Sequence, residues 1–136
     1  MRRPILAAAI LLGLTVPAAA EERLAVELNK LEDFDGGCRS FFLFRNPAPR
    51  GFSAFEMALA ILDSDGVIDR LLTIDAAPLP AQRTTLKIFE IPEIGCARIG
   101  EIILHDMPAC TPDRGEIDEC FAAIDLGSRA GVPLVK

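Results

Sequence analysis

The 136-residue sequence has no tryptophan, no tyrosine and a single histidine, and it is poor in cations, with 14 lysines and arginines against 20 acidic residues. A protein without a cationic surplus does not displace counterions from phosphates, which argues against nucleic acid and anionic lipid as partners. The sequence also lacks a Cys-x-x-Cys pair and a second histidine. We therefore expect no thioredoxin-type redox centre, no metal and no cofactor.

No apolar run is long enough to cross a membrane. The most apolar segment extends from Ile5 to Val16, and these residues reach only about 18 Å as a helix, against a hydrocarbon thickness of ~30 Å. Arg2 and Arg3 precede this segment, and small residues follow it up to Ala20. This order predicts a signal peptide over residues 1–20 and no membrane insertion after its cleavage. We expect a periplasmic or secreted protein, exported by the general secretory route rather than the twin-arginine route.

The chain that remains after cleavage is short and acidic. Residues 1–20 include two of the 14 basic residues and none of the 20 acidic ones, so their removal leaves 116 residues and a net charge of −8. This length is typical of one domain with one core. We expect the domain to cover residues 21–126. Glycine, serine and proline in residues 127–136 predict a loosely held tail.

All four cysteines lie in the part of the chain that is exported. An even number of cysteines in an exported protein predicts two disulfides, and four cysteines allow three connectivities. Cys110 and Cys120 enclose a polar turn that a disulfide would clamp. We therefore expect Cys110 to pair with Cys120, and Cys38 with Cys96.

Apolar and polar residues alternate over short runs, which is the period of a strand. Asp65-Gly66 separates two such runs and predicts a hairpin turn. The final run, 120–126, allows either a strand or a short helix, and we favour the strand. The pattern predicts an all-β, two-sheet antiparallel sandwich of immunoglobulin-like type, without the tryptophan that marks immunoglobulin domains. The seven expected strands lie near 23–31, 38–45, 55–63, 67–75, 85–91, 99–105 and 120–126.

Several short motifs resemble those of a known group of sequences. They are G-C-R-x-x-F-x-F-x-N from Gly37, L-x-x-x-G-V-I-x-R from Leu62, A-P-L-P from Ala77 and I-G-x-I-x-L-x-D from Ile99. In this order they resemble a family of small exported bacterial proteins of unknown function, often labelled as Tat-pathway signal proteins. The resemblance implies a small periplasmic sandwich domain and assigns no catalytic residue.

The residues able to support catalysis or metal binding do not form a complete set. His105 lies beside Asp106, but no Gly-x-Ser-x-Gly motif accompanies them, and the strand period places the two on opposite faces. The segment 63–66 is favoured as a turn over a calcium loop, because Ile61 stands where an EF-hand needs an oxygen ligand. The acidic residues near 33–35 and 116–119 are expected to be solvated. We therefore expect that the protein is not an enzyme.

One predicted strand carries a candidate binding surface. Its members are Arg39, Phe41, Leu43 and Arg45, which share the face opposite Phe42. If that face is exposed, it offers aromatic and cationic groups to a partner; if it is covered, it forms a second core layer from which the arginines reach solvent.

Three functions remain in contention. The favoured one is a non-enzymatic module that binds a periplasmic or envelope protein. The alternative is a secreted inhibitor that inserts its Cys110–Cys120 loop into a hydrolase, since a preorganised loop lowers the entropic cost of binding. The third is a small hydrolase that uses His105 or paired carboxylates.

Overall fold

The computed structural model describes residues 12–16 and 23–136 of the chain. Apart from residues 12–16, the signal peptide expected over 1–20 lies outside this described part. Within it, no helix has the length and apolar character needed to cross a membrane.

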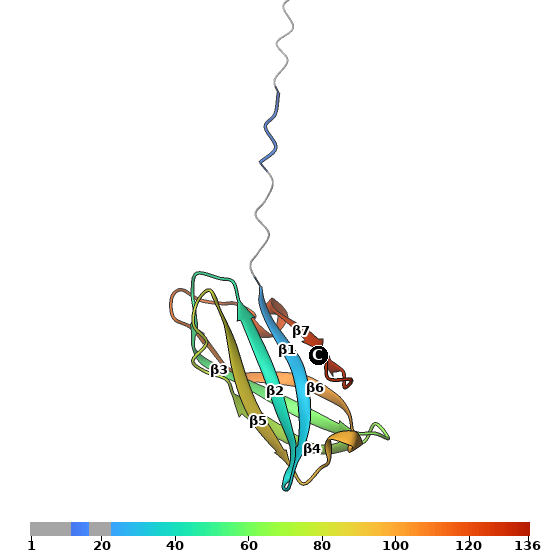
Figure 1. Ribbon diagram of the computed structural model, residues 1–136. Coiled ribbons are helices and arrows are strands. Elements are labelled where there is room, and N and C mark those ends of the chain that lie inside the picture. The colour runs from blue at the N-terminus through green and yellow to red at the C-terminus, as the bar shows by residue number, and fades with distance from the viewer. Residues whose placement is uncertain (1–11, 17–22) are drawn as a thin grey trace, which may run out of the picture.

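Eight strands form two four-stranded sheets. The two sheets pack face to face (Figure 1). Sheet A has the order β5-β2-β1-β7 and sheet B the order β4-β3-β6-β8. The predicted two-sheet all-β sandwich is therefore confirmed. The elements are β1 (Leu24–Phe34), β2 (Gly37–Asn46), β3 (Phe52–Asp63), β4 (Ile68–Asp75), β5 (Arg83–Pro92), η1 (Cys96–Arg98), β6 (Ile99–Pro112), α1 (Cys120–Ala123), β7 (Ile124–Ser128) and β8 (Leu134–Val135).

The central strands follow an immunoglobulin-like order. The first strand pairs with the second and the second with the fifth, while the third pairs with the fourth and the sixth. The expectation of purely antiparallel sheets is wrong at one edge of each sheet, because β7 runs parallel to β1 and β8 runs parallel to β6. The expected 120–126 strand divides into the short helix α1 and the start of β7.

The C-terminal segment also differs from expectation. Residues 127–136 were expected to be loosely held, yet they contain the end of β7 and all of β8. Val132 and Leu134 are buried in the core cluster. The physical reason is that the two apolar side chains cover the sandwich edge that β1 and β6 leave open.

The core lies between the sheets and is rich in phenylalanine. On β2, Phe42 and Phe44 both point inward and are almost completely buried. The Phe44 ring lies 6.3 Å from that of Phe42 and 6.0 Å from that of Phe55, and Phe55 lies 5.5 Å from Phe52. This chain of aromatic contacts joins sheet A to sheet B in a protein that has no tryptophan.

Both predicted disulfides are confirmed. Cys38 on β2 is bonded to Cys96 at the start of η1, with a Cα–Cα distance of 5.0 Å. Cys110 on β6 is bonded to Cys120 at the start of α1, with a Cα–Cα distance of 6.4 Å. The first bridge fixes the connection between the sheets, and the second closes the polar turn.

A register shift between β3 and β4 changes the face of the sheet on which Ile68 lies. Alternation alone places Ile68 on the inner face with Leu72 and Ile74, but Ile68 is 60% exposed. The pairing of β3 with β4 shifts between Ile61 and Leu62, so that Asp69 is an extra residue on β4. An extra residue moves everything beyond it to the opposite face, which explains the exposure of Ile68.

Candidate functional site on the outer face of sheet A

The residues proposed as a binding surface lie together on the outer face of sheet A. Leu43 on β2 pairs with Leu86 on β5, and Phe41 pairs with Ile88. Leu86 is 54% exposed and Ile88 is 48% exposed, whereas Phe41 and Leu43 are half-buried by their neighbours. We call these four residues the apolar strip. Within the described part of the chain no second layer covers it, so the face is open.

A charged row borders the apolar strip at one end. Arg39 on β2 lies between Glu32 on β1 and Glu90 on β5, with guanidinium nitrogens 3.6 Å from a carboxylate oxygen of each. Lys30 also donates a hydrogen bond to Glu32 at 2.8 Å, and this contact is the main cause of the lowered pKa of the Glu32 carboxyl. The cations in this row are thus already engaged by carboxylates.

The opposite end of sheet A is basic. Three arginines, Arg23, Arg45 and Arg83, line an open hollow of about 460 Å³. They come from the residue before β1, the end of β2 and the start of β5, and sheet pairing brings them together. The remaining lining residues are Ala25, Asn46, Pro47, Gln82 and Thr84, so none of the described residues that line the hollow is a carboxylate.

Two carboxylates hold two of the three arginines of the basic end. Asp125 accepts a hydrogen bond of 2.8 Å from Nε of Arg23. Glu27 has one carboxylate oxygen 3.3 Å from Nη1 of Arg45 and 3.3 Å from Nε of Arg129. These contacts fix the positions of Arg23 and Arg45.

Glu27 is ionised more readily than an ordinary glutamate. A hydrogen bond of 2.8 Å from the Asn29 amide is the largest cause that lowers its pKa below 4.5, followed by the hydrogen bond from Arg129 and the charge of Arg45. A carboxyl with a lowered folded-state pKa stabilises the fold above its unfolded pKa, and this contribution is lost as the pH falls through the folded value.

Replacing Glu27 with glutamine is expected to lower the free energy of unfolding by about 0.5–1 kcal/mol at pH 7, because two arginines lose their partner. The difference should shrink as the pH falls through the lowered pKa of Glu27, because the protonated carboxyl carries no charge. Urea unfolding at pH 7 and over a descending series of acidic pH values measures both quantities. Glu101→Gln is the control, because Glu101 forms no ion pair among the described residues. Equal stability of Glu27→Gln and the unmodified protein at pH 7 would contradict the assignment.

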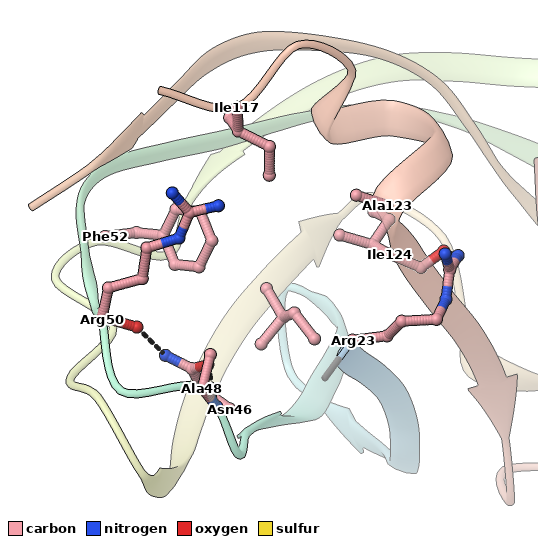
Figure 2. Close-up of a pocket in the computed structure, with 9 residues that line it drawn as sticks. Arg23, Asn46, Ala48, Arg50, Phe52, Ile117, Ala123 and Ile124 are labelled. Carbon is pink, nitrogen blue, oxygen red and sulfur yellow. Dashed lines mark hydrogen bonds between the residues drawn. The ribbon is translucent and has the colours of Figure 1, made fainter. Parts of the chain in front are cut away.

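A second, smaller pocket shares Arg23 and Asn46 with the basic hollow, and Figure 2 shows Arg23 and Arg50 on its two sides. Its volume is about 80 Å³, below the roughly 300–1,000 Å³ of typical ligand pockets. Its polar side chains are engaged: Asn46 donates to the carbonyls of Arg50 and Pro80, and Arg50 donates to those of Arg114 and Glu116. The polar side chains around this pocket therefore have a structural role at one end of the sandwich.

Hydrogen bonds from arginine side chains hold the Cys110–Cys120 loop in addition to its disulfide. In addition to the two bonds from Arg50, Nη2 of Arg114 donates to the carbonyl of Pro49 at 2.7 Å. The loop is thus tied to the connection between β2 and β3. The sequence indicated the disulfide but not these reciprocal arginine contacts.

The other sequence candidates lie apart from one another. His105 and Asp106 are both exposed on β6, and Asp106 accepts a hydrogen bond from the Met107 amide. Asp63 uses one carboxylate oxygen to accept from the amides of Asp65 and Val67, which is the role of a turn residue. Within residues 12–16 and 23–136, no three metal-ligating side chains gather into a site.

Sheet B has an apolar outer row that the sequence analysis missed. Leu71 pairs with Ala60, Ala60 with Ile103, and Ile103 with Val135. Leu71 is 65% exposed. The signal was the doublet Leu71-Leu72, because two adjacent leucines in a strand cannot both face the core.

The apolar strip with its charged borders is therefore the candidate site that combines aromatic, aliphatic and cationic groups on one open face. Comparison of the chain with protein-family models, with curated proteins and with solved structures finds no match.

Proposed function

We propose that the protein is a non-enzymatic, exported interaction module that binds a periplasmic or envelope protein through the outer face of sheet A. The observation that carries this proposal is the apolar strip, which lies open between two charged borders. Burial of apolar area by a partner would supply the main driving force, and the charged borders would orient that partner.

The choice of sheet A over sheet B follows from side-chain type. Aromatic residues and arginine are enriched in the energetically important parts of protein interfaces. The sheet A face offers Phe41, with Arg39 and Arg45 in the flanking rows, whereas the apolar row on sheet B contains aliphatic side chains only. The ammonium of Lys30 lies 5.4 Å from the centre of the Phe41 ring, so cations already pack on this aromatic surface.

Export to an oxidising compartment is supported by the two disulfides and by the N-terminal sequence. Disulfides persist outside the cytoplasm and are rare within it. The resemblance to small exported bacterial proteins agrees with this location. The route of export stays part of the proposal.

Photo-crosslinking tests the proposed surface. A photoreactive phenylalanine analogue at Leu86 is expected to give a discrete adduct in the envelope of the producing cells, because Leu86 lies within the apolar strip. The same analogue at Leu71, which is as exposed but lies on sheet B, serves as the matched control. We expect a yield at least about fivefold higher from Leu86, as local burial by a partner requires. No adduct at Leu86, or equal yields from both positions, would refute the proposal.

A further inference from the structure

We propose that the basic hollow at the end of sheet A is a binding site for an oxyanion, that is, a carboxylate or phosphate group. The hollow is lined by Arg23, Arg45 and Arg83, together with Gln82 and Thr84. This inference does not depend on the proposed protein partner. The site would recognise a small molecule or a charged group on a larger envelope component.

The first argument is local charge. The whole chain carries a net charge of −6, so arginines in it would be expected to lie near carboxylates in excess. Among the described residues at this hollow the balance is reversed: Arg23 contacts Asp125, Arg45 shares Glu27 with the nearby Arg129, and Arg83 contacts no carboxylate. These four arginines and two carboxylates leave a local surplus of positive charge, which attracts an anion.

The second argument is unused hydrogen-bonding capacity. A guanidinium has five N–H donors and matches the geometry of carboxylate and phosphate. Arg23 uses Nε and Nη2 on Asp125 and on the carbonyls of Ala122 and Ile124, which leaves Nη1 without a contact in the described structure. Arg45 contacts Glu27 through Nη1 alone. Arg83 makes no side-chain hydrogen bond or ion pair with any described residue, so the free donors at the hollow come mainly from Arg45 and Arg83.

The third argument is preorganisation and size. Because Asp125 and Glu27 already hold Arg23 and Arg45, an anion would have to order mainly the Arg83 side chain, which lowers the entropic cost of binding. The hollow of about 460 Å³ falls within the roughly 300–1,000 Å³ of small-molecule sites. Arg45 and Thr84 also lie one cross-strand row from Leu43 and Leu86 on the outer face, so a ligand with an anionic group and an apolar body could contact both.

Isothermal titration calorimetry on the oxidised, exported protein tests the site at low ionic strength, with succinate and inorganic phosphate as the two probes. We expect at least one probe to bind one-to-one with a dissociation constant in the millimolar range or below, which corresponds to about −4 kcal/mol or stronger. Saturation by phosphate alone would assign a phosphate group as the ligand, and saturation by succinate alone would assign a carboxylate.

Substitutions separate the site from general charge effects. Arg83→Gln should raise the dissociation constant about tenfold, and Arg83→Lys should raise it less because it keeps the charge. Arg98→Gln, at an exposed arginine in η1, removes the same charge far from the hollow and should leave the constant unchanged. Absence of saturation by both probes would overturn the proposal, and so would an equal effect of Arg83→Gln and Arg98→Gln.

Discussion

Replacing both Cys38 and Cys96 with alanine is expected to lower the free energy of unfolding by about 4 kcal/mol, by the loop-entropy relation for a long closed loop. The bridge spans 58 residues and links β2 to the segment that leads into sheet B, so its loss frees much of the unfolded chain. A domain of this size has a total stability of only about 5–15 kcal/mol. Guanidinium unfolding of the two oxidised proteins measures the difference.

The second bridge provides the matched comparison. Cys110 and Cys120 are only 10 residues apart, and the same relation predicts a loss of about 3 kcal/mol when both become alanine. The order of the two effects is the informative result. A larger loss from the Cys110–Cys120 pair than from the Cys38–Cys96 pair would contradict this account of how the fold is stabilised.

Phe42→Ala is expected to cost about 3–5 kcal/mol of unfolding free energy, because it deletes a large buried side chain and leaves a cavity. The Phe42 ring is 1% exposed and contacts the rings of Phe44 and Phe89 at 6.3 Å and 5.9 Å. Chemical unfolding monitored by circular dichroism measures the loss.

The neighbouring residue on the other face is the control for this prediction. Phe41→Ala removes the same side chain from the outer face of sheet A and should cost no more than about 1 kcal/mol. Similar losses from the two substitutions would mean that both faces of β2 are buried, as a second core layer would require, and that the apolar strip is not an open surface.

The sandwich and its disulfides could be predicted because their signals are local. Alternation along β2 and β5 identifies the inward side chains without knowledge of their partners. The Asp65-Gly66 turn identifies the β3–β4 hairpin in the same way. The polar turn between Cys110 and Cys120 indicated the shorter bridge, and the remaining two cysteines then had to pair.

The features that the sequence did not predict depend on pairing between distant segments. The extra residue at Asp69, which turns Ile68 outward, follows from the register of β4 against β3. The parallel pairing of β7 with β1 and of β8 with β6 likewise has no local signal in the sequence. The basic hollow joins Arg45, which the sequence analysis selected, to Arg23 and Arg83, which it did not, because only the order β5-β2-β1 brings their strands together.

The most direct test of the proposed interaction surface is the yield of the Leu86 photo-adduct in the background of a second substitution, Ile88→Asp. Ile88 lies two residues along β5 on the same face and is half exposed, so an aspartate there places a charge within the apolar strip without disturbing the core. The account predicts that the adduct falls at least about tenfold, as expected for a charge at an interface centre, while the unfolding midpoint stays the same. An unchanged adduct yield would contradict the assignment of this face as the interaction surface.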